Sequence, residues 1–282
     1  MRSVLITGTS TGIGEATTKV LAARGWRVFA TMRDLSRRAA LEQALNEIGL
    51  RDRVDFEQLD VTEPNSIRNA LAAVLLRTGN RLDAVVHNAG VAAGGAFEDL
   101  PQDTVRRVME TNFFGILELT RQLLPIFRLQ KKGRIVIVSS EVVFNPQPAN
   151  SIYCASKWAL EGWADSLTYE LKPFGIDILL IEPGPCRTRI WESSPRFMPA
   201  TSPYRAWMQH VSEAGGRFVD NVAGEPHDVA KVIAAALEAR RPSFRYSVGP
   251  LARLNHALHG KVPARLKHRV VAWYLGLLQF RS

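Results

Sequence analysis

A tyrosine and a lysine four residues apart, Tyr153 and Lys157, are the side chains in this sequence with the clearest potential for chemistry. On a helix, residues i and i+4 lie on the same face. An ammonium group beside a phenol favours the phenolate. We therefore expect Lys157 to lower the pKa of Tyr153 from about 10 and to make it an acid or base near neutral pH. The alternative is an amphipathic helix that carries both residues without a catalytic role.

A glycine-rich segment near the start of the chain has the features of a phosphate-binding loop. Residues 7–14 read Thr-Gly-Thr-Ser-Thr-Gly-Ile-Gly and lie between an apolar run and a helical pattern. Glycine lets the backbone turn with positive φ and approach a pyrophosphate, and the N-terminus of the next helix offers unpaired N–H groups. A tight turn without a ligand is the alternative. The segment predicts a dinucleotide site formed by Gly8, Ser10, Thr11, Gly12, Ile13 and Gly14.

The end of the second predicted strand indicates which dinucleotide binds. An NAD site places a carboxylate at this point, whereas an NADP site places a cation beside the 2′-phosphate. The first charged residue is Arg33, which favours NADP(H), and the neighbouring Asp34 keeps NAD(H) open. Asp60, at the end of the third predicted strand, could either meet the adenine amino group or cap a helix.

The elements that must position these residues follow from an alternation of apolar runs with helical patterns. The runs cover residues 4–7, 27–31, 54–59, 82–87, 134–139, 176–181 and 244–248. The helical patterns cover residues 15–24, 35–48, 64–77, 102–130, 152–172 and 226–239. This order predicts an α/β fold with a doubly wound, Rossmann-like parallel sheet of about seven strands. We expect one dinucleotide-binding and catalytic domain over 1–250, with a substrate-covering insertion near 189–225, and a basic amphipathic extension over 251–282.

Composition excludes several other classes of protein. Two cysteines in 282 residues exclude a disulfide framework and a cysteine-rich zinc module, and we expect no metal site. No apolar run reaches the 18 or more residues of a membrane-spanning helix. A strand-like run begins three residues after Met1, so we expect no secretion signal and a cytoplasmic protein.

The net charge of +9 is confined to one end of the chain. Nine of the 36 basic residues and none of the 27 acidic residues lie in 239–282, so the other 27 basic residues balance the acidic ones. A neutral body does not offer the basic, aromatic-rich surface that nucleic-acid binding requires, so we expect no nucleic-acid partner.

Taken together, the motifs resemble those of the short-chain dehydrogenase/reductase family over nearly the whole chain, most closely its hydroxysteroid and retinol dehydrogenase branch. The resemblance implies that Tyr153 exchanges a proton with the carbonyl oxygen of the substrate and that Lys157 holds the nicotinamide ribose. Ser140, which lies 13 residues before Tyr153, would hydrogen-bond the same oxygen. Asn112, in the long helix, would anchor a water that links Lys157 to solvent. The other residues that carry the resemblance, and that would line the cofactor, are Asp60, Val61, Asn88, Ala89, Gly90, Pro183, Gly184 and Thr188.

The substrate is less clearly indicated than the reaction. The insertion near 189–225 is rich in large apolar residues: Trp191, Phe197, Met198, Tyr204, Trp207, Met208 and Phe218. They favour a lid over a small hydrophobic alcohol or ketone of the steroid, retinoid or lipid kind, although the same residues could simply pack on the core. A 3-oxoacyl-thioester reductase and a non-catalytic dinucleotide sensor are the alternatives. The resemblance also implies a homodimer or homotetramer.

The basic tail has a pattern that the family motifs do not explain. Apolar residues recur at intervals of four and three, at Leu266, Val270, Trp273, Leu277 and Phe280, which predicts a one-sided helix. Arg265, Lys267, Arg269 and Arg281 flank this stripe. The stripe could dock on the body or on a partner subunit, lie peripherally on an anionic membrane, or recognise an acidic carrier protein.

Overall fold

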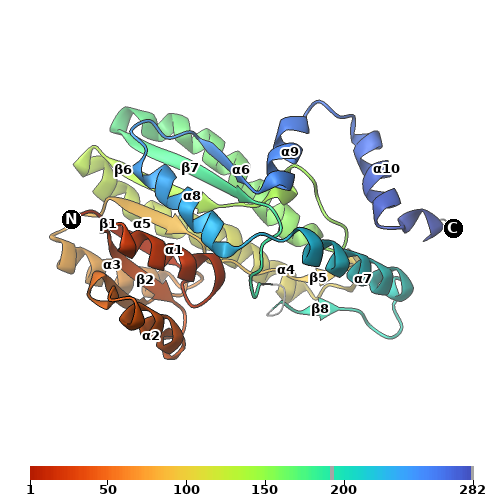
Figure 1. The fold of residues 1–282 in the computed structure, drawn as a ribbon, viewed down its shortest axis with the longest axis horizontal. Helices are drawn as coiled ribbons and strands as arrows, with labels where there is room; N and C mark the ends of the chain where they lie inside the picture. Colours follow the sequence, from red (N-terminus) through yellow and green to blue (C-terminus); the bar gives the residue numbers. More distant parts are fainter. Residues whose placement is uncertain (191–193, 281–282) are drawn as a thin grey trace.

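The central sheet of the computed structural model has seven strands in the order β3-β2-β1-β4-β6-β7-β9, and the structure describes residues 1–190 and 194–280 (Figure 1). The strands are β1 (Ser3–Thr7), β2 (Arg27–Met32), β3 (Val54–Gln58), β4 (Ala84–His87), β6 (Gly133–Val138), β7 (Ile176–Pro183) and β9 (Arg245–Val248). All of the pairings between them are parallel. The predicted doubly wound α/β fold is therefore confirmed.

Helices cover both faces of this sheet. The α-helices of the described residues are α1 (Gly12–Ala23), α2 (Ala39–Glu47), α3 (Pro64–Thr78), α4 (Gln102–Met109), α5 (Gly115–Gln130), α6 (Ser151–Leu171), α7 (Arg205–Val222), α8 (Pro226–Glu238), α9 (Pro250–Leu258) and α10 (Ala264–Tyr274). Because successive residues of a strand point to opposite faces, Leu5 packs in the core with α3, α5 and α6. Val4 and Ile6 pack in the second core with α1, α2 and α8.

The helix predicted over 102–130 is present over that whole range, but it is not α-helical throughout. A π-helical segment, Glu110–Phe114, separates α4 from α5. Asn112 lies inside that segment and is fully buried, and its side chain bonds both backbone groups of Val91. Gly115 then packs tightly on the chain after β3, since a Cβ built on it would lie 2.4 Å from the Val61 carbonyl oxygen. Both contacts hold the helix close to the sheet at the turn where its backbone hydrogen bonds change from the α-helical to the π-helical pattern.

The insertion and the tail lie beyond the sheet. The insertion contains α7 and β8 (Arg196–Phe197), which pairs with β5 (Gly94–Gly95). Helices α9 and α10 form an arm at the C-terminal end (Figure 1). Two residues considered above, Trp191 and Arg281, lie outside the described residues. None of the helices in the described ranges is long and apolar enough to cross a membrane.

The arm touches the body at a few points. Leu275 accepts a hydrogen bond through its carbonyl from Nε2 of His210, at 2.7 Å, and Tyr274 packs edge-on against Phe218. The predicted stripe is not one helix, because α10 ends at Tyr274 and Gly276 takes a positive φ of 66°. Leu277 therefore lies outside the face of α10 that carries the earlier stripe residues.

Candidate active site

The strand order reverses between β1 and β4, which makes the carboxyl ends of these strands the expected binding crevice of a doubly wound sheet. The glycine-rich loop follows β1 and opens α1. Gly8 and Gly12 have φ values of 70° and 65°, and a Cβ on Gly8 would lie 2.8 Å from Cα of Ala89. Thr11, which precedes α1, makes no side-chain cap bond, so the first N–H groups of the helix remain available to phosphate oxygens.

The loop after β4 is fastened to the glycine-rich loop. Nδ2 of Asn88 donates hydrogen bonds to the carbonyls of Thr7 and Gly8, both at 2.9 Å. The Thr7 hydroxyl in turn accepts the backbone N–H groups of Asn88 and Ala89, both at 3.0 Å. The two loops are therefore held together by four hydrogen bonds. This arrangement suits a dinucleotide site, in which the backbone must lie close to the cofactor.

The loop after β7 closes the same crevice from the opposite side. The N–H of Gly184, just after Pro183, donates to the Val248 carbonyl at 2.9 Å. Thr188 then lies over the glycine-rich loop, because a Cβ on Gly12 would meet its side chain at 3.3 Å. A side chain at position 12 would thus fill the space between the two loops.

The charged residues after β2 differ in how they are engaged. Asp34 accepts the N–H of Ser36 at 3.0 Å, and hydrogen bonds from the Ser36 side chain and from this N–H lower the pKa of its carboxyl group. Arg33 is exposed. Asp60 holds a turn, accepting the N–H of Thr62 at 2.9 Å and its hydroxyl at 2.8 Å. Asp60 therefore does not cap α3, whose N-cap is Glu63 and receives no side-chain cap bond, and Val61 beside it is buried.

The three predicted catalytic side chains come together in a buried cluster. Tyr153 and Lys157 lie on the first turns of α6, and Ser140 follows β6. Ser140 and Tyr153 share a hydrogen bond through their side chains. The Lys157 ammonium donates to the Val138 carbonyl at 2.9 Å and lies 5.7 Å from the centre of the Tyr153 ring. All three side chains are less than a tenth exposed.

The prediction that Tyr153 has a lowered pKa is wrong. Burial raises the pKa of Tyr153 to about 12, and the hydrogen bond with Ser140 opposes this only in part. Burial likewise lowers the pKa of Lys157 to about 8. Desolvation outweighs the attraction between the two groups because the ammonium lies beside the ring and bonds Val138. Tyr153 is thus a protonated acid at neutral pH.

Asn112 joins this cluster to the β4 loop. Its Nδ2 donates to the Val91 carbonyl at 2.8 Å and to the Ser156 hydroxyl at 2.9 Å, and its Oδ1 accepts the Val91 N–H at 2.8 Å. A Cβ on Gly90 would lie 3.5 Å from Oδ1 of Asn112 and 3.8 Å from Nζ of Lys157. The side chain of Asn112 therefore holds the loop and α6 together close to Lys157.

Sequence reasoning missed the buried charges behind the cluster. Glu161 of α6 and Glu182 of β7 are both buried and pair with Arg245 of β9. The one available signal was the spacing of Glu161, which follows Lys157 by four residues and so shares its helix face. Glu141, next to Ser140, is also buried, and burial raises its pKa to about 7.

Comparison with known proteins agrees with this geometry. The family described as short chain dehydrogenase matches residues 2–198. The chain belongs to that family. This short chain dehydrogenase is 33% identical to retinol dehydrogenase 8 of Homo sapiens, covering 96% of this chain and 90% of the relative. It is 34% identical to 17-beta-hydroxysteroid dehydrogenase type 1 of Homo sapiens, covering 86% and 76%.

Solved structures extend the likeness to the tail. A short-chain dehydrogenase from Streptomyces avermitilis superimposes with a TM-score of 0.80 at 30% identity, covering 100% of this chain and 99% of the other. A metagenomic short-chain oxidoreductase in complex with NADP has a TM-score of 0.69 at 26% identity, covering 88% and 96%. The protein is therefore an NAD(P)-dependent oxidoreductase of the branch that contains hydroxysteroid and retinol dehydrogenases.

Proposed function

We propose that this short chain dehydrogenase uses NADP(H) to interconvert a hydrophobic ketone or aldehyde and its alcohol, and that it works best as a reductase. The observation that carries the proposal is the buried cluster of Ser140, Tyr153 and Lys157 beside the glycine-rich loop. The raised pKa of Tyr153 supports the reductive direction, because a protonated phenol is the acid that carbonyl reduction requires.

The residues divide the work of the reaction as follows. Ser140 and Tyr153 hydrogen-bond the carbonyl oxygen and orient the carbonyl carbon. The nicotinamide, when bound, supplies the hydride. Tyr153 gives its proton to the oxygen as the C–H bond forms, so one hydride and one proton convert C=O into CH–OH. Lys157 holds the nicotinamide ribose, and its positive charge stabilises the phenolate until Tyr153 regains a proton from solvent.

The preference for NADP(H) rests on the contrast between the two charged residues after β2. Asp34 is already committed to the N–H of Ser36, whereas Arg33 is exposed at the end of the strand where a 2′-phosphate is read. A guanidinium forms strong charge-assisted hydrogen bonds with phosphate. An NAD(H) site would need the Asp34 carboxylate to bond the ribose hydroxyls. Because that carboxylate already accepts hydrogen bonds from Ser36, the sequence position favours NADP(H) over NAD(H).

A hydrophobic substrate is supported by the surroundings of the acid. The side chain of Tyr153 packs with Ala92, Val142, Cys154 and Ile190, which are all apolar. Relatives named for retinol and for a hydroxysteroid fit the same substrate class. The test is NADPH oxidation by the full chain against retinal, steroid ketones, aliphatic ketones and 3-oxoacyl thioesters. Turnover of the thioesters alone would overturn the substrate class, and no turnover of any carbonyl would overturn the function.

A homo-oligomer is supported by apolar side chains left exposed on α5 and α6. Leu129 of α5 is 85% exposed, and Tyr169 of α6 is 77% exposed. Trp158, on the same helix as Tyr169, is also exposed. Helix α6 carries Tyr153 and Lys157, and α5 lies beside it in the same core. A subunit interface through these two helices would therefore hold the catalytic side chains in place. Light scattering of the purified protein gives the test, and a monomer would contradict this part of the proposal.

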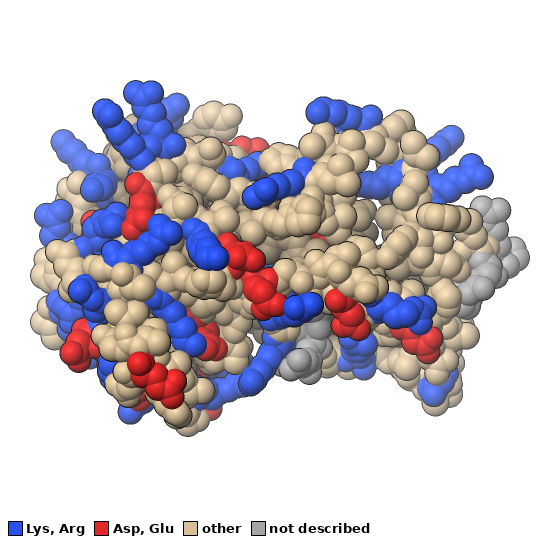
Figure 2. Space-filling view, in the orientation of Figure 1, with Lys and Arg blue, Asp and Glu red and all other residues tan. Residues whose placement is uncertain are grey.

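Peripheral contact with a membrane is supported by the outer face of α10. Leu266 and Val270 are each 53% exposed and Trp273 is 70% exposed, so much of the apolar surface of these stripe residues is open to solvent. Figure 2 shows Lys and Arg, without Asp or Glu, on the part of α9 and α10 in view. Exposed apolar side chains among basic ones suit an anionic lipid surface, from which hydrophobic substrates can partition into the enzyme.

A further inference from the structure

A cluster of buried charges lies immediately behind the catalytic lysine. Nη1 of Arg245 contacts Oε2 of Glu161 and lies 2.7 Å from Oε1 of Glu182. The second oxygen of Glu182 accepts the Ser247 hydroxyl at 2.8 Å. Glu161 is 4% exposed and Glu182 is fully buried, so neither carboxylate is solvated by bulk water.

This cluster contains two acidic side chains that share one guanidinium. Burial raises the pKa of Glu161, and the Ser139 hydroxyl and Arg245 oppose this, so a further cation nearby stabilises its charged form. Lys157 lies one helical turn before Glu161, on the same face of α6, and is buried as well. Its ammonium donates to the Val138 carbonyl and not to a carboxylate, so the interaction with Glu161 is one between charges and not a hydrogen bond. Burial lowers the pKa of Lys157, and Glu161 raises it.

The other titratable groups around Glu161 come from four neighbouring segments. Glu182 lies on β7 and Arg245 on β9, as described above. His256 of α9 lies 3.7 Å from Oε2 of Glu182, and its Nδ1 shares a hydrogen bond with Ser247. Glu141, after β6, accepts a hydrogen bond from Nδ2 of Asn255 at 3.1 Å. Among these groups, Arg245 contacts Glu161 directly and holds its carboxylate in place.

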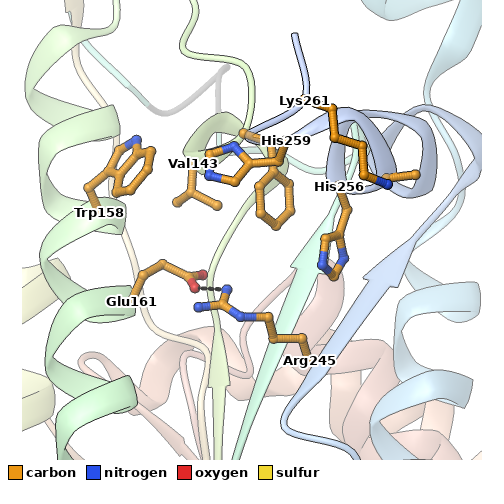
Figure 3. A pocket seen from close by; sticks show the side chains of 9 residues that line it. Val143, Trp158, Glu161, Arg245, His256, His259 and Lys261 are labelled. Carbon is orange, nitrogen blue, oxygen red and sulfur yellow. Dashed lines mark hydrogen bonds and ion pairs between the residues drawn. The ribbon is translucent and has the colours of Figure 1, made fainter.

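Glu161 and Arg245 also line a cavity that is separate from the cofactor crevice. The cavity has a volume of about 430 Å³ and lies between α6 and α9, with Trp158, Phe144, His256 and His259 among its walls (Figure 3). The ion pair of Glu161 with Arg245 lies at one side of this space (Figure 3). Side chains from α6, β9 and α9 therefore meet behind Lys157, on a different side from the loops that would hold the dinucleotide.

We propose that Glu161 is a positioning residue for the reaction: its carboxylate, which lies one helical turn after Lys157 and is fixed by Arg245, stabilises the positive charge of the buried Lys157 side chain. This inference rests on the proposed function, because it assigns Lys157 a role that depends on its positive charge. It adds a third group, Glu161, to Tyr153 and Lys157, the two residues whose spacing suggests catalysis. Glu161 itself touches neither substrate nor cofactor.

The test compares Glu161→Gln with the wild type across pH. Glutamine keeps the shape of the side chain and removes its charge. Arg245 and Glu182 remain as an ion pair, so we expect the variant protein to fold. An opposite charge at close range shifts a pKa by one unit or more, so the basic limb of the kcat/KM profile should move down by about one pH unit. On that limb, one unit corresponds to about tenfold lower kcat/KM. The affinity for NADPH, measured by tryptophan fluorescence, should fall over the same pH range.

Two matched variants separate positioning from stability. Glu182→Gln removes a charge from the same ion pair but not from the helix face of Lys157, so it should lower the melting temperature without moving the pH limb. Glu161→Asp keeps the charge and should restore the wild-type limb. If Glu161→Gln does not fold, Glu161→Met, which removes the charge and keeps an unbranched side chain of similar length, must show the lowered limb, and a wild-type limb in that variant would overturn the role of Glu161.

The outcomes also distinguish this inference from the proposed function. Identical pH profiles for Glu161→Gln and the wild type, in turnover and in NADPH binding, would overturn the role of Glu161 and leave the function intact. A shift of equal size in Glu182→Gln would also overturn it. If no carbonyl is reduced by the wild type, the function fails, and the pH dependence of NADPH binding still tests Glu161.

Discussion

The Lys157 ammonium lies 5.7 Å from the centre of the Tyr153 ring and gives its hydrogen bond to the Val138 carbonyl, not to the phenol oxygen. The phenol instead shares its hydrogen bond with Ser140. This arrangement leaves Tyr153 protonated and in contact with the residue that would hold the same carbonyl oxygen. It also leaves the remaining N–H groups of Lys157 free to meet a ribose.

Arg33 should set the cofactor preference. Arg33→Ala removes the charge beside the 2′-phosphate, so kcat/KM with NADPH should fall about 10- to 150-fold, as expected for the loss of a charge-assisted hydrogen bond worth roughly 1.5–3 kcal/mol. The same variant should leave kcat/KM with NADH nearly unchanged, which serves as the internal control. Equal kcat/KM for both cofactors in the wild type would count against this assignment.

His87 should make the protein sensitive to acid. It is buried in β4, its Nε2 bonds Thr120 at 2.9 Å, and burial lowers its pKa to about 3. Below pH 6.5, His87 binds a proton in the unfolded chain but stays neutral in the folded chain. The stability of the fold therefore decreases as the pH falls from 6.5 toward 3. At pH 5 the loss amounts to about 2 kcal/mol.

The variant His87→Gln tests this sensitivity. The glutamine amide reaches the position of Nε2, so it can still bond Thr120, and it does not titrate; the difference in unfolding free energy between pH 7 and pH 5 should therefore shrink by about 2 kcal/mol. Urea unfolding at the two pH values measures it. An unchanged difference would show that other groups, such as the buried glutamates, dominate the acid response.

The outer face of α10 should govern lipid binding. A triple variant, Leu266→Ser, Val270→Ser and Trp273→Ser, removes exposed apolar surface while leaving the Leu275 contact with His210 in place. Full-length wild type should co-sediment with anionic vesicles, less so at high salt, and the variant should bind at least tenfold more weakly at an unchanged melting temperature.

Leu76→Ser provides the control for lipid binding, because Leu76 is 85% exposed on α3, far along the chain from the basic arm. It should bind vesicles as the wild type does. The account of lipid binding would be contradicted if the wild type does not bind anionic vesicles, or if the triple variant dissociates into monomers. Dissociation would show that the outer face of α10 contacts a partner subunit.

The sheet and the catalytic cluster were accessible from the sequence because they rest on local patterns. Apolar runs such as Val4 to Thr7 identify buried parallel strands, and the resemblance to the family identified Ser140 through its distance along the chain from Tyr153. The π-helical turn at 110–114 could not be predicted from the sequence. The chain is helical on both sides of it, and the turn depends on a contact between Asn112 and Val91.

The electrostatics of the site were not accessible from the sequence either. The sign of the Tyr153 pKa shift depends on burial, which outweighs the nearby lysine. The group formed by Glu161, Glu182 and Arg245 depends on the pairing of β7 with β9, which brings together residues from distant parts of the chain. The fold therefore decides both.

The central claim is that Tyr153 supplies the proton in carbonyl reduction, and the most direct test is the kcat of NADPH oxidation by Tyr153→Phe. With a ketone that the wild type reduces, kcat should fall about 10²- to 10⁴-fold, because the general acid is lost. NADPH affinity should stay within about twofold, since the glycine-rich loop and Lys157 are untouched. A variant that keeps more than about a tenth of the wild-type kcat would contradict the assignment of Tyr153 as the acid.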